Sequence, residues 1–118
     1  MGECLIQQKS FEFAIGIVRL YRKLQARQEF VLSPHLLRSG TRIGIQVEQA
    51  VYKRNQQSQL FVDKILAATD EARETRYWLR LLQESRLADI DVSLELYQIE
   101  EIIQLLLDAV SPDGKTAT

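Results

Sequence analysis

The chain has 118 residues, of which 46% are hydrophobic and 26% are charged, and its formal net charge is −1. This composition is typical of one compact domain with a single core, so we expect residues 1–118 to form one domain. The longest apolar runs, such as Leu105-Leu106-Leu107, are far shorter than the roughly 20 residues needed to cross a bilayer, which excludes a membrane-spanning protein.

Cys4 is the only cysteine, so the chain cannot form an internal disulfide. The first residues lack the positively charged, apolar and small-residue pattern of a secretory leader. We therefore expect a protein of the reducing cytoplasm.

The first predicted helix covers about Ser10 to Gln28, where apolar side chains recur at the spacing of one helical face. After a break at residues 30–32, the second predicted helix begins at Ser33-Pro34, because serine can accept amide protons at a helix start and proline fits the first turn. It ends in the polar segment from Lys53 to Gln57. The residues expected to face inward are Phe13, Ile17, Leu20, Tyr21 and Leu24, then Leu36, Gly40, Ile43, Val47 and Ala50.

The third and longest predicted helix begins at Ser58, and the fourth begins near Asp91 after a turn at residues 85–90. In both helices the apolar residues alternate steps of three and four, which is the pattern of a heptad seam. Pro112-Asp113-Gly114 ends the fourth helix. The two seams are Phe61, Ile65, Ala68, Ala72, Thr75, Leu79 and Leu82, then Val92, Leu96, Ile99, Ile103, Leu106 and Val110.

Four helices of similar length, joined by short connections, predict an all-α fold in the form of an antiparallel up-down-up-down four-helix bundle. Neighbouring helices in such a bundle cross at about 20°. We expect an ordered core over about residues 8–111 and a flexible C-terminal tail over residues 112–118.

Gly40 and Gly44 lie one turn apart on one side of the second predicted helix. A glycine inside a helix costs about 1 kcal/mol relative to alanine, so the pair predicts a close contact that offsets this cost. The favoured interpretation is a helix-packing notch filled from within the bundle. The alternative is a notch for a ligand or a partner.

The last predicted helix is acidic and unusually apolar. Residues 1–87 carry 14 lysines and arginines against 9 acids, whereas residues 88–118 carry Lys115 against 7 acids. This asymmetry can match faces of two subunits or steer a polyanion to the basic part. Ile102, Leu105 and Ala109 extend the apolar surface beyond one seam, which predicts an oligomer interface, and Trp78 is a candidate anchor there. The alternative is a wide core face within one chain.

The candidate residues for binding nucleic acid are arginines and a lysine on three predicted helices. Arginines three or four residues apart share a helix face and can bridge successive phosphates, and Tyr77 can stack on a base if it is exposed. The alternative, favoured for Arg73 and Arg76, is ion pairing with carboxylates. The candidates are Arg19, Arg22, Lys23, Arg27, Arg38, Arg42, Arg73, Arg76 and Arg80.

The sequence contains no recognisable catalytic or metal-binding constellation. His35 is the only histidine, and with Cys4 it falls short of the three or four ligands of a zinc site. A glycine-rich phosphate loop, a Ser-His-Asp set and a Glu-x-x-His pair are absent. The arginine–histidine spacing of the HEPN ribonucleases is absent as well, because a helix break separates Arg27 from His35. We expect neither an enzyme nor a cofactor-dependent protein.

Two motifs carry a resemblance to a known family. They are Leu36-Leu37-Arg38-Ser39-Gly40-Thr41, with Ile43-Gly44 and Glu48-Gln49-Ala50 after it, and Ala72-Arg73-Glu74-Thr75, with Tyr77-Trp78-Leu79-Arg80-Leu81-Leu82 after it. From about Phe11 to Val110, the chain resembles the bacterial four helix bundle protein family. This family is also called the 23S rRNA intervening-sequence proteins, because some members are encoded in insertions within that RNA gene.

The resemblance implies a left-handed bundle that assembles as a ring, typically a homopentamer. The implied shape is related to that of the accessory variability determinant of diversity-generating retroelements, which binds nucleic acid and a reverse transcriptase. The chain departs from the family pattern at Arg42 and at Ile45-Gln46, where members commonly have serine and an Ala-Asn pair. The polar surface after the first motif therefore differs in this chain.

These observations predict a non-enzymatic homo-oligomeric scaffold or adaptor, with a pentamer favoured by the resemblance. The alternative is a nucleic-acid-binding accessory protein that uses basic patches on the ring, with RNA or DNA as its partner. A third hypothesis is an antitoxin-like protein whose partner is another protein chain, which would co-purify with it in fixed stoichiometry.

Overall fold

The computed structural model describes residues 2–53 and 58–111, and within these ranges the chain forms four α-helices and no strand. The helices are α1 (Gly2–Ala26), α2 (Ser33–Lys53), α3 (Ser58–Ser85) and α4 (Ser93–Ala109). The prediction of an all-α fold with four helices is confirmed. The expected C-terminal tail, residues 112–118, lies outside the described residues. Among the described helices, none combines the length and the apolar character that crossing a membrane requires.

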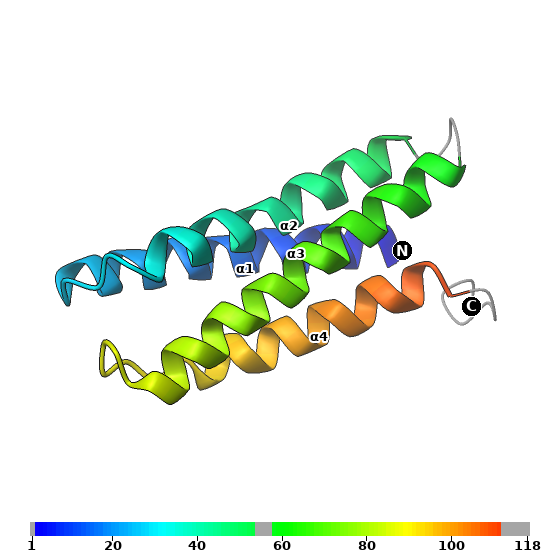
Figure 1. The fold of residues 1–118 in the computed structure, drawn as a ribbon. Helices are drawn as coiled ribbons and strands as arrows, with labels where there is room; N and C mark the ends of the chain where they lie inside the picture. The colour runs from blue at the N-terminus through cyan, green and yellow to red at the C-terminus, as the bar shows by residue number, and fades with distance from the viewer. Residues whose placement is uncertain (1, 54–57, 112–118) are drawn as a thin grey trace.

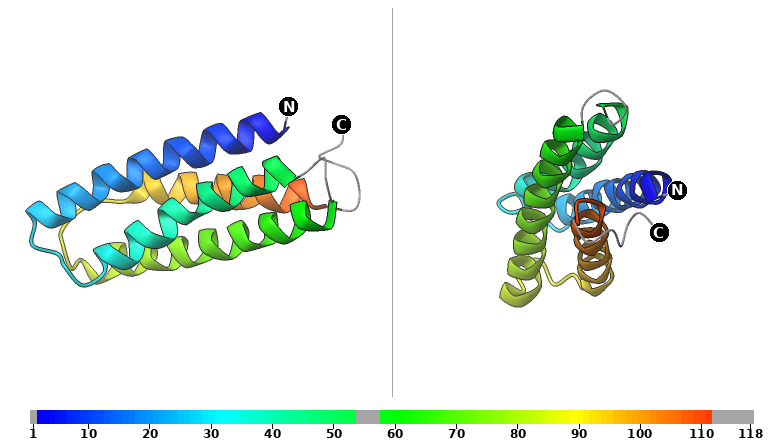
Figure 2. Two further views of the ribbon diagram at one scale, coloured as in Figure 1. Left: turned by 90° about the horizontal axis from the view of Figure 1, so that it is seen from above. Right: turned by 90° about the vertical axis from the view of Figure 1, so that its right-hand side faces the viewer.

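Consecutive helices run in opposite directions (Figure 1). α2 and α3 make the most extensive contact, α1 packs on α2, and α4 packs on both α3 and α1. Seen end-on, α1 and α4 lie on one side of the molecule and α2 and α3 on the other (Figure 2). The result is an elongated bundle with extents of 45 × 22 × 19 Å.

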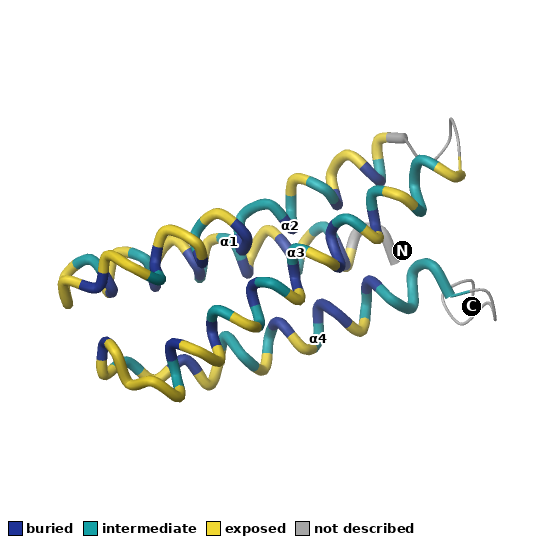
Figure 3. Tube along the Cα trace, viewed as in Figure 1, coloured by how far each residue is buried: buried dark blue, intermediate teal, exposed yellow. Residues whose placement is uncertain are grey.

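The inner faces of the four helices close one apolar core (Figure 3). Every residue predicted to face inward on α2 is buried, and so is every seam residue of α3 except Phe61, which is half-buried. On α1 and α4 the predicted faces are also correct, with half-buried residues at their edges. These half-buried residues are Tyr21, Leu96 and Val110.

The predicted start of the first helix is wrong, and the fourth helix begins two residues later than predicted. α1 begins at Gly2 rather than near Ser10, because Ile6 extends the buried face of the helix by two turns and Ser10 is itself buried. α4 begins at Ser93 rather than at Asp91. The carboxylate of Asp91 accepts hydrogen bonds from the Ser93 hydroxyl at 2.6 Å, the Gln83 amide at 2.9 Å and the Ser93 backbone N–H at 3.0 Å, which lowers the pKa of Asp91 and holds it outside the helix.

A buried glutamate, rather than Ser33, caps the start of α2. The Glu29 carboxylate accepts hydrogen bonds from the backbone N–H groups of Val31, Leu32 and Ser33, at 2.9, 2.8 and 2.7 Å. The Ser33 hydroxyl donates to the Glu29 carbonyl at 2.8 Å and accepts a bond from Gln25 at 2.8 Å. One carboxylate therefore satisfies the amide protons of the two residues before α2 and of its first residue.

We predict that Glu29→Ala lowers the free energy of unfolding by about 3 kcal/mol, because three backbone donors lose a charged acceptor in a site that excludes water. Glu29→Gln should lose less, since the amide oxygen can still accept. Urea denaturation followed by circular dichroism measures both variants. Glu84→Gln, at an exposed position, is the control. A Glu29→Ala variant as stable as this control would contradict the capping role.

The two glycines of the predicted notch face α1. A Cβ built on Gly40 would lie 3.0 Å from Cγ1 and from Cγ2 of Ile17, and one built on Gly44 would lie 3.8 Å from the Ser10 carbonyl oxygen. Ile17 is fully buried and β-branched, so its side chain has few alternative rotamers. The chain itself therefore occupies the space at Gly40.

We predict opposite effects for alanine at two helical glycines. Gly16→Ala should stabilise the chain by about 1 kcal/mol, because no atom lies within 4 Å of the new Cβ and alanine has the higher helix propensity. Gly40→Ala should destabilise it by about 1 kcal/mol, because the strain against Ile17 exceeds the gain in propensity. Thermal and urea unfolding measure the difference, and equal stabilities of the two variants would contradict the close packing at Gly40.

Candidate interaction surfaces

Three arginines on the face shared by α2, α3 and α4 are paired with carboxylates of a neighbouring helix. Arg42 Nε lies 2.9 Å from Glu71 Oε2, and Arg38 lies 3.6 Å from Glu74. Arg76 lies 3.0 Å from Glu100 across the α3–α4 contact. A phosphate at any of these arginines would have to compete with a carboxylate that is already in place.

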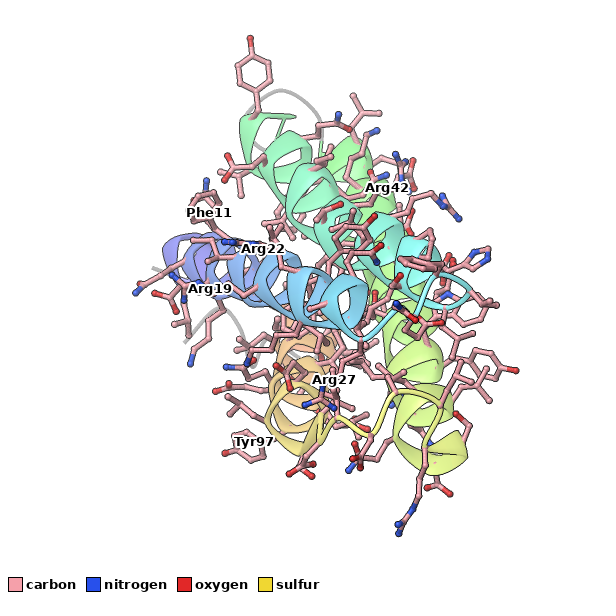
Figure 4. The ribbon with its side chains drawn as sticks, turned by 90° about the vertical axis from the view of Figure 1, so that its left-hand side faces the viewer. Phe11, Arg19, Arg22, Arg27, Arg42 and Tyr97 are labelled. Carbon is pink, nitrogen blue, oxygen red and sulfur yellow. The ribbon has the colours of Figure 1, made fainter. Side chains whose placement is uncertain are left out.

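Other candidate basic residues have no ion pair with another described side chain. Arg19 and Arg22 are exposed on the second half of α1 (Figure 4). Lys23 on α1 and Arg80 on α3 are exposed as well. Arg27 has a structural role instead, because its guanidinium donates to the carbonyl of Ala88 at 3.1 Å and to that of Asp89 at 2.8 Å. These two bonds tie the end of α1 to the connection between α3 and α4.

Trp78 packs between two helices of its own chain. Its ring stacks on His35 with a centroid separation of 4.7 Å and an interplanar angle of 20°. Its indole N–H donates to Glu74 at 3.0 Å, and Tyr77 meets the ring edge-on at 5.4 Å. Trp78 is half-buried by these contacts, whereas Tyr77 is 60% exposed. Within one chain, Trp78 therefore anchors α3 to α2, and Tyr77 is the ring that remains accessible.

The apolar surplus on the second half of α4 is covered by the chain itself. Ile102 is only 3% exposed, and Leu105 and Ala109 are half-buried against the core. This burial matches the wide core face that the sequence left open as an alternative. The exposed apolar residues of α4 lie at its other end, at Leu94 and Tyr97.

An apolar stripe that we did not predict from the sequence lies on the outer face of α1. Phe11, Ile15 and Val18 are 64%, 37% and 44% exposed. Their spacing of four and three places them on one side of the helix, opposite the buried Phe13 and Ile17. The signal was present in the sequence as a second set of apolar residues at helical spacing.

Two clefts among the described residues carry charges of both signs. One lies between α1 and α4, and the other lies at the end of the bundle beside the α3–α4 connection. Within residues 2–53 and 58–111, no group of three or more His, Cys, Asp or Glu side chains is placed to hold a metal ion. The first cleft is lined by Lys9, Glu12, Phe13, Gln98, Glu101 and Ile102, and the second by Lys23, Ala26, Arg27, Asp89, Ile90 and Asp91.

Comparisons with known proteins give one family. A family model described as 23S rRNA-intervening sequence protein matches residues 3–108. A solved structure of a protein with unknown function from the S23 ribosomal protein family of Bacteroides thetaiotaomicron VPI-5482 is 37% identical, with a TM-score of 0.82. The match covers 92% of this chain and 97% of that chain. No curated protein matches the chain.

Proposed function

We propose a scaffold function for this chain, which belongs to the 23S rRNA-intervening sequence protein family. Membership extends over residues 3–108 and confirms the resemblance carried by the two sequence motifs. In this proposal the protein is a non-enzymatic homo-oligomeric scaffold or adaptor. Its chain is an up-down-up-down bundle that assembles as a ring, and the resemblance favours five copies.

The observation that carries the proposal is the apolar stripe on the outer face of α1. Phe11, Ile15 and Val18 line up along one side of a helix whose opposite side is already buried in the core. Large apolar side chains gathered on one face usually mark a protein interface. A scaffold formed by copies of the chain would cover this stripe.

The proposed role in assembly needs no catalytic group among the described residues. The described residues offer no metal-ligand cluster, and the sole histidine, His35, is stacked on Trp78. The description of the solved relative names no activity. The proposal therefore assigns no catalytic residue and no cofactor.

We predict that the purified chain elutes as an oligomer whose mass is a multiple of 13.6 kDa, about fivefold for a pentamer. Val18→Glu should reduce the mass, because it places a charge in the apolar stripe. Leu66→Glu, at a position of similar exposure on α3, is the matched control and should keep the wild-type mass. Size-exclusion chromatography with light scattering measures all three. A wild-type mass of one chain at tens of micromolar would overturn the proposal.

A second candidate function is nucleic-acid binding, for which the outer face of α3 provides the supporting observation. Arg73, Tyr77 and Arg80 follow each other at spacings of four and three on one exposed face. Neither arginine has an ion pair with another described side chain. Two cations on either side of an accessible aromatic ring suit a single strand, with phosphates on the arginines and a base on the tyrosine.

For this second function, we predict that a fluorescein-labelled single-stranded RNA binds with an affinity that falls steeply as salt rises. The double variant Arg73→Gln/Arg80→Gln should weaken binding and should flatten the slope of log affinity against log salt by about 0.7 for each arginine that no longer meets a phosphate. Arg76→Gln, whose guanidinium is paired with Glu100, is the control. Fluorescence anisotropy measures these affinities, and the absence of binding at low salt would remove this candidate.

A further inference from the structure

The outer faces of α1 and α4 match each other in charge as well as in apolar character. The second half of α1 and the whole of α4 each carry charges of a single sign beside exposed apolar residues. From Phe13 to Ala26, α1 has three basic residues and no acid, whereas α4 has four acids and no basic residue. The basic residues are Arg19, Arg22 and Lys23, and the acids are Glu95, Glu100, Glu101 and Asp108. Glu100 and Glu101 are already paired with Arg76 and Lys9 of the same chain, whereas Glu95 and Asp108 have no ion pair with another described side chain.

The exposed apolar residues of α1 and of α4 also lie at the same level along the bundle. Lys9 on α1 is paired with Glu101 on α4 at 3.2 Å, and the two helices run in opposite directions (Figure 1). Ile15, six residues after Lys9, is therefore level with Glu95, six residues before Glu101. By the same count the stripe from Phe11 to Val18 is level with residues 92–99. Leu94 and Tyr97, which are 63% and 72% exposed, lie within that interval.

The charges continue this match towards one end of the bundle. Beyond the apolar stripe, Arg19 and Arg22 continue along α1 towards the end of the bundle at which Asp89 and Asp91 precede α4. The cleft that Lys23 and Arg27 share with Asp89 and Asp91 independently places these segments at the same end. Asp89 and Asp91 are both exposed. The alignment of α1 and α4 that places their exposed apolar residues at the same level therefore also places opposite charges at the same end of the bundle.

In one chain, the outer faces of α1 and α4 point in different directions. Phe11 and Arg22 project from the side of α1 nearer to α2, whereas Tyr97 projects outward from α4 (Figure 4). The exposed apolar residues of α1 therefore cannot contact those of α4 within a single chain. Two copies can make this contact, if the α1 face of one meets the α4 face of the next, and a contact between two different faces repeats until it closes into a ring.

We propose that the outer face of α1 in one copy packs against the outer face of α4 in the next copy, without a shift along the bundle. This inference rests on the proposed homo-oligomeric function and names the surfaces that build the oligomer. A rotation about an axis parallel to the helices leaves the level of every residue unchanged. Leu94 and Tyr97 of one copy then meet the stripe of Phe11, Ile15 and Val18 of its neighbour, and Arg19 and Arg22 come near the acidic start of α4.

The outer face of α3 offers no comparable match. Its exposed apolar residues, Leu66, Tyr77 and Leu81, stand among charges of both signs, such as Asp70 and Arg73. Such a face has no preference for the acidic or for the basic side of another copy. The single-sign charges of α1 and α4 therefore favour a contact between these two helices.

Mixing two variants tests the pairing of different faces. Val18→Glu damages the α1 face and leaves the α4 face intact, and Tyr97→Glu does the reverse. Because every contact uses one face of each kind, either full-length variant alone should run as a single chain in light scattering. The equimolar mixture should contain a 1:1 dimer held by the one contact in which both faces are intact. Circular dichroism checks the folding of both variants, and Val18→Ser with Tyr97→Ser replaces any variant that does not fold.

The outcomes separate this inference from the function on which it rests. A wild-type protein of single-chain mass removes both. A wild-type oligomer that either variant leaves intact, or a mixture without the 1:1 dimer, overturns the α1–α4 contact while the homo-oligomer stands. In particular, contacts between identical faces would leave each variant as a dimer on its own, and mixing would then add no new species.

Cross-linking tests whether the contacting helices of neighbouring copies are aligned without a shift along the bundle. In a Cys4→Ser background, Ile15→Cys with Leu94→Cys places two thiols at nearly the same level on facing helices of neighbouring copies. A short bismaleimide should then give a ladder of covalent oligomers on a denaturing gel, ending at the number of copies in the ring. The control pair Ile15→Cys with Gln104→Cys lies more than two turns out of level and should give no ladder. A ladder from the control pair, or none from the level pair, would contradict a contact without shift.

Discussion

The close approach of α1 to α2 at Gly40 determines which surfaces of this molecule remain outside. Ile17 lies so near Gly40 that even an alanine would be crowded, and this contact fixes the rotation of α1 about its own axis. With Ile17 and Phe13 turned inward, the other apolar residues of α1, Phe11 and Val18 among them, must face outward. The core and the exposed stripe are therefore two results of one packing contact.

The core could be predicted from sequence because its signal is local. Apolar residues repeat every three or four positions, and the inner face of α2 was correct from Leu36 to Ala50. Helix starts were less predictable, since they depend on contacts outside the periodic pattern. Glu29 caps α2 from a position before the helix, and Ile6 extends α1 across Ser10, a residue type that commonly precedes a helix. A local pattern cannot distinguish a buried Ser10 from a capping one.

The surfaces were less predictable than the core, because they depend on which helices become neighbours. Arg42 and Glu71 are 29 residues apart and pair only because α2 lies against α3. Likewise, whether Ile102 is exposed depends on whether α1 covers α4, and periodicity within α4 alone cannot decide this. The two motifs were enough to identify the family. Which arginines form ion pairs with carboxylates depends on how the four helices pack, and this could be seen only in the structure.

The two proposed functions use different faces and are therefore compatible. A ring built through α1 and α4 would cover the stripe from Phe11 to Val18 and would draw Arg19 and Arg22 towards the acids at the start of α4. Arg73, Tyr77 and Arg80 lie on the outer face of α3, which takes no part in that contact. Each copy would then present this row once around the ring. A weak contact with one strand segment would be repeated by every copy, and the combined affinity would exceed that of a single chain.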